Sequence, residues 1–254
     1  MPTDLAYDAK FYQNQSEGSK RSAEIVAQVV LDVMDVKSVC DVGCGVGSWL
    51  SAWRDLGVRD FLGVDGGYVS EDWLMIPPAQ FMPHDLKKPL QIDRTFDLAT
   101  SFEVAEHLPA SVAEQFVSSL VRLSSAVLFS AAIPGQGGTL HINEQWPEYW
   151  AKLFRDKGYI PVDFVRWKIW NNPEVEWWYA QNTMLFCSEH YLNSMPSLQA
   201  VMRERAVDQL SVVHPRQFEV ACNRVKSEPM YFADLVRELP RSFVRALKNR
   251  SKHL

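Results

Sequence analysis

Three glycines at alternate positions, Gly43, Gly45 and Gly47, constrain this chain most. The apolar stretch 38–42 before them is typical of a short buried strand, and apolar side chains recur at helical spacing over 49–56 after them. Glycine allows the tight, close-approach backbone that a nucleotide-binding turn requires. The G-x-G-x-G pattern lacks the longer spacing expected where a pyrophosphate sits on a helix N-terminus, so it favours a ligand without phosphates. A strand-to-helix connection that binds nothing is the alternative.

An acidic residue ends the next predicted strand, over 60–65. Asp65 follows Gly47 by about the twenty residues over which dinucleotide folds place a ribose-binding carboxylate. Such a carboxylate can accept hydrogen bonds from both ribose hydroxyls. Since Gly66 and Gly67 follow, a simple turn aspartate is the alternative, but the preceding glycine turn favours the ribose interpretation.

Further segments follow in a recognisable order. After DVGCGVG and GVDG come PHDLKKPL at 83–90, FDLATSFEVAEHLP at 96–109 and VLFSAAIP at 127–134. In this order they resemble the class I S-adenosylmethionine-dependent methyltransferases, specifically the small-molecule branch that includes ubiquinone-biosynthesis enzymes. The resemblance covers roughly residues 7 to 188.

The resemblance implies S-adenosylmethionine as cofactor and a set of residues that hold it. By position these are Asp41, Gly43, Cys44, Gly45, Asp65, Gly66, Asp85, Leu86, Ser101 and Glu103. The glycine loop would carry the methionine part, and Asp65 would bind the ribose. Asp85 and Leu86 would flank the adenine, while Ser101 and Glu103 would face the methionine and the sulfonium.

Periodicity gives the expected layout of the chain. Helices are expected at 22–33, 109–123 and 147–157, a fifth strand at 126–132, and sixth and seventh strands at 164–170 and 177–187. Alternating strands and helices predict an α/β, three-layer sheet with its ligand at the carboxyl ends of the strands. The resemblance adds a Rossmann-like methyltransferase fold of seven mostly parallel strands, with the last strand antiparallel and paired in a hairpin through NNPEVE. The expected domain is 1–189, with 1–21 as an N-terminal lid segment, followed by a helical C-terminal extension at 190–254.

Composition limits the class of protein. The 254 residues and 47% hydrophobic content suit one large α/β domain with additions. A net charge of −5 argues against a broad nucleic-acid footprint. The four cysteines have no C-x-x-C spacing, so reduced thiols are expected. With no signal peptide and no apolar run of the ~20 residues that span a bilayer, a cytoplasmic location is expected and membrane association is not. The methyltransferase site is expected to hold no metal.

Methyl transfer from a sulfonium is an in-line displacement, so the protein chiefly positions the acceptor. An acceptor oxygen must also lose a proton, which makes His141, His107 and Glu106 the candidate bases. His141, in the loop after the fifth strand, is the first choice, with a loop-capping hydrogen bond as its alternative role. His107, in EVAEHLP, is either a base or a positioning residue beside the cofactor.

The acceptor is the least constrained part of the interpretation. Six tryptophans within 146–178 suit an aromatic-walled pocket for a sugar or a flat ring, although plain core packing accounts for any one of them. We therefore expect a small-molecule acceptor, with oxygen on a sugar, glycoside or natural-product scaffold favoured. Small-molecule N-methylation and a cofactor-binding protein without catalysis are the alternatives. A basic amphipathic stretch at 237–252 is expected to be a solvated face, with contact to an anionic surface or polyanion as the alternative, and the extension could serve as a lid, an oligomer contact or a substrate cap.

Overall fold

The computed structural model describes residues 9–204 and 209–227. The chain forms two compact units, Met1–Gln217 and Phe218–Leu254, and helix α9 (Pro215–Ser227) runs across the boundary between them. All candidate site residues belong to the first unit. The basic stretch 237–252 and Tyr7 of the expected lid segment lie outside the described residues.

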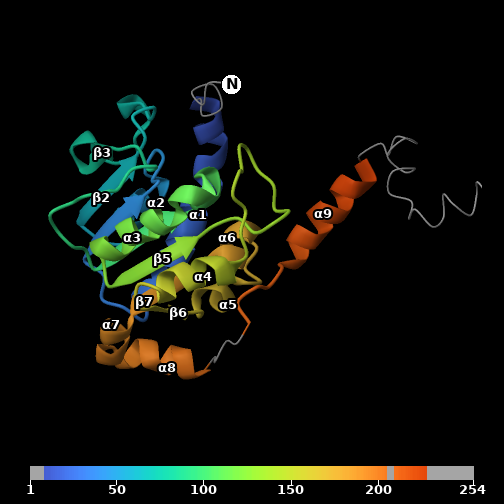
Figure 1. Ribbon diagram of the computed structural model, residues 1–254. Coiled ribbons are helices and arrows are strands. Elements are labelled where there is room, and N and C mark those ends of the chain that lie inside the picture. The colour runs from blue at the N-terminus through green and yellow to red at the C-terminus, as the bar shows by residue number, and fades with distance from the viewer. Residues whose placement is uncertain (1–8, 205–208, 228–254) are drawn as a thin grey trace, which may run out of the picture. The chain divides into compact units, whose positions relative to one another are not determined.

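Within the described residues, seven strands form one sheet in the order β3-β2-β1-β4-β5-β7-β6 (Figure 1). The strands are β1 (Ser38–Val42), β2 (Asp60–Asp65), β3 (Phe81–Pro83), β4 (Leu98–Phe102), β5 (Ala126–Ser130), β6 (Tyr159–Val162) and β7 (Met184–Ser188). Strand β7 runs antiparallel to both of its neighbours, and β1 to β5 pair in parallel. The predicted Rossmann-like sheet with an antiparallel last strand is confirmed.

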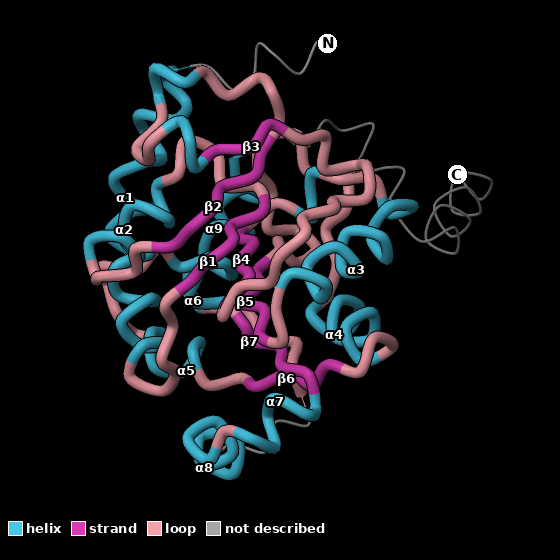
Figure 2. Tube along the Cα trace, turned by 90° about the vertical axis from the view of Figure 1, so that its left-hand side faces the viewer, coloured by secondary structure: helices cyan, strands magenta, loops and turns pink. Residues whose placement is uncertain are grey.

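Helices cover both faces of this sheet. The helices of the first unit are α1 (Ala9–Leu31), α2 (Ser48–Asp55), α3 (Ala113–Leu123), α4 (Pro147–Arg155), α5 (Val165–Ile169), α6 (Trp177–Asn182), α7 (Glu189–Ser194) and α8 (Pro196–Glu204). Short 3-10 turns are η2 (Glu71–Trp73), η3 (Pro78–Gln80), η4 (Ala105–His107) and η5 (Ala110–Val112). Helices α1, α2 and α5 lie against one face and α3 and α4 against the other (Figure 2).

The central strands are apolar on both sides because both faces are covered. In β1, Val39 packs into the core beneath α1 and α2, and the next residue, Cys40, packs into the core beneath α3 and α4. Leu98 and Ala99 in β4 alternate in the same way. Successive side chains enter cores on opposite faces of the sheet, so the strand before the glycine turn is buried along nearly its whole length instead of alternating between buried and exposed residues.

The predicted hairpin of strands 164–170 and 177–187 is wrong in its first strand and in half of its second. Residues 164–170 contain helix α5 and residues 177–182 are helix α6, so β6 comes earlier and β7 begins only at Met184. Val165 and Ile169 are both fully buried at a spacing of four, which is the period of a helix. The β-branched and aromatic residues of this segment pack a helical face, so tertiary packing overrides their strand propensity.

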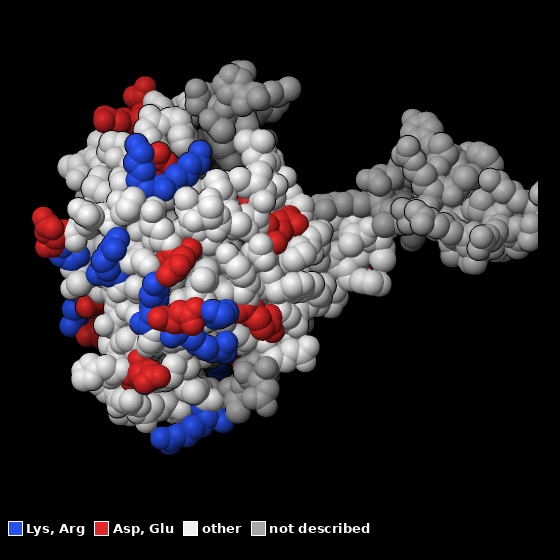
Figure 3. Space-filling model, in the orientation of Figure 1, with Lys and Arg blue, Asp and Glu red and all other residues white. Residues whose placement is uncertain are grey.

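The described surface carries both signs of charge. Figure 3 shows lysine and arginine side chains interspersed with aspartate and glutamate on one face of the molecule. Among the described helices, none combines the length and the apolar character needed to cross a membrane.

Candidate functional site

The carboxyl ends of β1, β2 and β4 meet at one edge of the sheet, and the glycine turn lies there. Gly43 and Gly47 adopt φ of +86° and +83°, in the left-handed region. A Cβ atom on Gly43 would lie 2.3 Å from Cγ2 of Val104, so a larger residue is excluded both by conformation and by space. The turn is tied to β2 because the amide of Gly43 donates to the carbonyl of Val64 at 2.7 Å.

Asp65 lies at the end of β2 and joins two loops. Its carboxylate accepts hydrogen bonds from the amides of Gly45 and Gly66 and from the hydroxyl of Tyr68, each at 2.6 Å. Burial raises the pKa of this carboxyl, and the three hydrogen bonds act in the opposite direction. The structure therefore brings together the glycine turn and the acid that were expected to act jointly. Tyr68 was not anticipated from the sequence.

Asp41 lies within β1, below the glycine turn, and is 2% exposed. One of its oxygens accepts a 2.7 Å hydrogen bond from the hydroxyl of Thr100 on the neighbouring strand β4. Burial raises the pKa of Asp41 to about 7, the charge of Asp65 adds to the rise, and the Thr100 hydrogen bond opposes it. A carboxyl group thus stands beneath the turn in a state that titrates near neutral pH.

The next candidate pair, Ser101 and Glu103, lies at the carboxyl end of strand β4. The hydroxyl oxygen of Ser101 is buried and has no hydrogen-bond partner among the described residues. Glu103, just beyond the strand, has φ of +53°, and its amide donates to the carbonyl of Ser130 on β5 at 3.0 Å. A non-glycine residue in this region stores backbone strain, which is most common at functional sites.

Two amide side chains fix the Glu103 carboxylate. Gln136 donates to one oxygen at 2.7 Å and Asn182 to the other at 3.0 Å. Burial raises the pKa of Glu103, and these donors lower it. Neither Gln136 nor Asn182 was singled out in the sequence.

The remaining cofactor candidates lie around this edge. Asp85 follows β3, whose last residue, Pro83, pairs in register with Asp65. Its exposed carboxylate accepts a 3.1 Å hydrogen bond from the amide of Lys87. Leu86 is partly buried against the apolar core. Cys44 is buried in the turn, where burial raises the pKa of its thiol well above the usual value.

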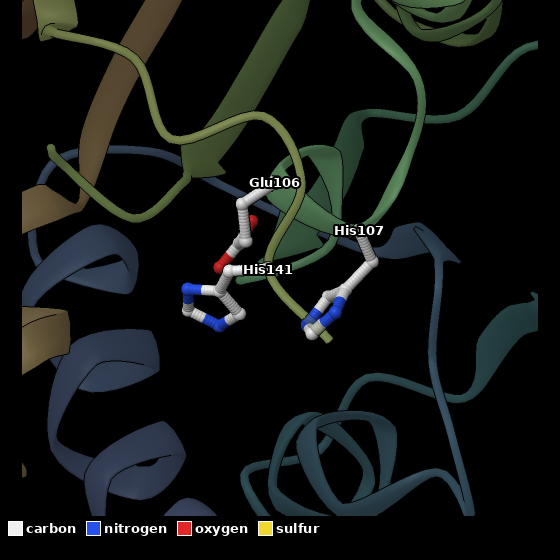
Figure 4. A group of neighbouring side chains, drawn as sticks. All are labelled: Glu106, His107 and His141. Carbon is white, nitrogen blue, oxygen red and sulfur yellow. The ribbon is translucent and has the colours of Figure 1, made fainter. Parts of the chain in front are cut away.

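The three candidate bases come together from two elements. Glu106 and His107 belong to η4, and His141 belongs to the loop after β5 (Figure 4). The amides of Ile142 and Asn143 donate to the carbonyl of Glu106 at 2.9 and 3.0 Å, so this loop is attached to the turn. The ring centroids of His107 and His141 lie 4.8 Å apart, and the two ring planes are at 86° to each other.

Burial shifts the pKa values of two members of this cluster, His107 and Glu106. Burial lowers the pKa of His107 to about 4, helped by the charge of His141, so its imidazole is neutral at pH 7. Glu106 is fully buried, and burial, together with the charge of Glu103, raises its pKa well above the ordinary value.

A carboxylate that the sequence did not reveal orients His141. Nδ1 of His141 lies 2.9 Å from Oε1 of Glu144, and the Glu144 carboxylate also accepts 2.7 Å hydrogen bonds from the amides of Gly135 and Gly137. Burial alone would raise the pKa of Glu144, but the hydrogen bonds from His141 and the two amides lower it. An ionised Glu144 requires the proton on Nδ1, which leaves the lone pair of His141 on Nε2.

The tryptophans divide between core and surface. Trp150 is 2% exposed and packs against Phe129, whereas Trp146 is 43% exposed. Trp49, at the start of α2, stacks on Phe102 at the end of β4 with ring centroids 3.5 Å apart. Core packing therefore accounts for Trp150, and an aromatic wall for a substrate stays a prediction.

Residues 15–182 match a family described as a methyltransferase domain. The match covers most of the chain, and the protein belongs to this family. The resemblance to class I S-adenosylmethionine-dependent methyltransferases is thereby confirmed, although the match does not single out the ubiquinone-biosynthesis branch. S-adenosylmethionine is the cofactor of such methyltransferases. No curated protein matches the chain.

Solved structures share the fold at low identity. An O-methyltransferase family protein from Burkholderia thailandensis is 13% identical with a TM-score of 0.50, over 73% of this chain and 62% of that one. Magnesium protoporphyrin IX methyltransferase from Synechocystis with bound S-adenosylhomocysteine is 21% identical with a TM-score of 0.47, and the match covers 66% of this chain and 82% of that one. A methyltransferase from Clostridium acetobutylicum is 12% identical with a TM-score of 0.48, and the match covers 66% of this chain and 91% of that one.

Proposed function

We propose that the protein transfers the methyl group of S-adenosylmethionine to an oxygen atom of a small molecule, with a sugar, glycoside or natural-product scaffold as the favoured class. One juxtaposition carries the proposal. The cofactor candidates at the ends of β1, β2 and β4 lead directly, through Glu103, into the cluster of Glu106, His107 and His141. A methyl donor and a proton-accepting group would then lie side by side, as O-methylation requires.

The residues at the sheet edge fit the cofactor. The backbone at Gly43 packs so closely against Val104 that a Cβ atom would overlap it, and Asp65 presents a fixed carboxylate at the end of β2. The Tyr68 hydroxyl already occupies one oxygen of that carboxylate, in the manner expected of a ribose hydroxyl. Ser101, whose buried hydroxyl lacks a partner among the described residues, and Glu103 would face the methionine part. The bound cofactor supplies an electrophilic methyl group and its own leaving group.

His141 is the proposed base. Its hydrogen bond to Glu144 holds the tautomer whose Nε2 carries the lone pair. Nε2 of His141 would accept the proton that the acceptor hydroxyl loses, while the bound cofactor would supply the methyl group. Burial and the charge of Glu103 raise the pKa of Glu106, and burial lowers the pKa of His107 to about 4, which makes His107 a weak base.

The family match ends at residue 182, which supports a catalytic domain at 1–189, although helices α7 and α8 at the start of the proposed extension belong to the first unit. Cys40, Cys44 and Cys187 are free and buried, which supports the proposed cytoplasmic location.

The test is the formation of S-adenosylhomocysteine with a panel of hydroxyl-bearing acceptors, in wild type, His141→Ala and His190→Ala. His190 is exposed and outside the site, so it serves as the matched control. We expect His141→Ala to slow turnover by about 10²- to 10⁴-fold while S-adenosylhomocysteine affinity is unchanged. Full turnover in that variant would remove the base role and favour an amine acceptor. Binding without turnover on any acceptor would indicate a protein that has lost catalysis.

A further inference from the structure

Three side chains of metal-ligand type converge beside the proposed methyl-transfer site. Glu106, His107 and His141 each offer one ligand atom, and these atoms all lie within 4.8 Å of one another (Figure 4). We propose that this triad binds a divalent first-row transition-metal ion. The proposal departs from the metal-free chemistry expected from the sequence.

Glu106 supplies an observation that points to a missing partner. Its side chain is 0% exposed, and neither carboxylate oxygen has a hydrogen-bond partner of good geometry among the described residues, although the backbone of Ala132 and the Glu103 side chain lie close enough to influence its pKa. A buried polar group without a partner is costly, and native structures seldom tolerate one without a reason. A cation bound between Glu106 and the two imidazoles would satisfy these oxygens.

His141 is oriented as metal-binding histidines usually are. Ligating histidines commonly donate their second ring N–H to a carboxylate, which fixes the tautomer and makes the ligating nitrogen more basic. Glu144 accepts from Nδ1 of His141 at 2.9 Å, and backbone amides of Gly135 and Gly137 hold Glu144 in turn.

The spacing and the chemistry of the donors restrict the ion. With metal–ligand distances of about 2.0 to 2.2 Å, donor atoms on one ion lie at most about 4.4 Å apart. The donor atoms of the triad lie within 4.8 Å of one another, and small side-chain rotations would bring them to this separation. Two imidazoles and one carboxylate suit zinc, iron, cobalt or manganese, whereas magnesium and calcium prefer oxygen donors alone. Three protein ligands leave positions open for a further ligand.

One consequence rests on the proposed function. An acceptor hydroxyl bound at an open position would lose its proton more readily, because a divalent ion lowers the pKa of an oxygen bound to it. His141 would then serve as a ligand to the ion rather than as the base.

The test is a titration of the chelator-treated full chain with Co²⁺, followed by calorimetry and by visible absorption, which reports cobalt with nitrogen ligands. We expect one Co²⁺ per chain and no comparable binding of Mg²⁺. Glu106→Gln, His107→Ala and His141→Ala should each weaken Co²⁺ binding at least tenfold, and His190→Ala should bind as wild type does. Absence of saturable binding, wild-type binding in all three triad variants, or an equal loss in His190→Ala would overturn the proposal.

Two additional readouts separate a lost ligand from a lost fold. Co²⁺ should raise the melting temperature of the wild type but not of the triad variants. Glu144→Gln retains an oxygen acceptor for His141 and leaves the triad intact, so it should weaken Co²⁺ binding about tenfold and restore part of what Glu144→Ala loses. S-adenosylhomocysteine binding without Co²⁺ binding would reject the metal site and leave the proposed function standing, and the reverse result would reject the proposed function alone.

Discussion

The hydroxyl of Tyr68 donates a 2.6 Å hydrogen bond to Oδ1 of Asp65. The oxygen that accepts it is one of the two that would bind ribose under the proposed function, and Tyr68 is 47% exposed. The protein thus satisfies one oxygen of Asp65 with its own side chain. Under the proposed ribose role of Asp65, cofactor binding would exchange one hydroxyl donor for another.

Replacing Asp65 with alanine should weaken S-adenosylhomocysteine binding. Hydrogen bonds to a charged group contribute about 1.5 to 3 kcal/mol, which corresponds to roughly 10- to 150-fold in Kd. Calorimetric titration of the variant measures this directly. Asp60→Ala is the matched control, since Asp60 lies at the opposite end of the same strand and is exposed. Unchanged affinity in Asp65→Ala would contradict the ribose role.

Replacing Tyr68 with phenylalanine should have the opposite effect. Removing the competing donor makes the exchange more favourable by about 0.5 to 1.5 kcal/mol, so the Kd for S-adenosylhomocysteine should fall about 2- to 10-fold. The same titration reports it. Binding that becomes much weaker would mean that Tyr68 contacts the cofactor instead of giving way to it.

Glu103→Gln should weaken binding of the methionine part of the cofactor without weakening binding of the adenosine part. The carboxylate accepts from both Gln136 and Asn182, and a glutamine amide can accept from only one of them. We expect at least tenfold weaker S-adenosylhomocysteine binding and nearly unchanged adenosine binding, compared in parallel titrations. An equal loss for both ligands would indicate a general structural defect.

Asp41 should make the stability of the cofactor-free protein depend on pH. Its pKa is raised from 3.8 to about 7 in the folded state, so its stabilising contribution is complete below about pH 4 and is lost as pH rises toward 7. The loss is at most about 4 kcal/mol. Asp41→Asn keeps an oxygen acceptor for Thr100 and removes the titration. Chemical unfolding at pH 5 and pH 8 should show the variant gaining stability relative to wild type at the higher pH, and an equal difference at both pH values would rule this out.

The sheet was largely predictable because its central strands are covered on both faces. Such strands read as mainly apolar runs, and functional residues at their carboxyl ends, such as Asp65 and Glu103, are found by counting along those runs. Helix α5 was missed because Trp167 and Ile169 have strand propensity. The helix is stabilised by Arg166, which is fully buried and paired with Asp163 at a spacing of three, and this burial depends on the tertiary structure.

The partners within the site were less predictable than the site residues. His107 and Glu106 belong to a recognisable segment, but Asn182 reaches Glu103 across 79 residues of sequence. No local pattern encodes such a contact. Glu144 lay within reach of sequence reasoning, since it stands three residues after His141 in a glycine-rich loop, and a histidine followed by a nearby carboxylate is a common orienting pair.

Calorimetric titration of the purified protein with S-adenosylhomocysteine, with NAD titrated in parallel, tests the central claim most directly. The account predicts micromolar, one-to-one binding of S-adenosylhomocysteine and no binding of NAD. Absence of S-adenosylhomocysteine binding, or a preference for NAD, would contradict the assignment of the glycine turn and Asp65 to a methyl donor.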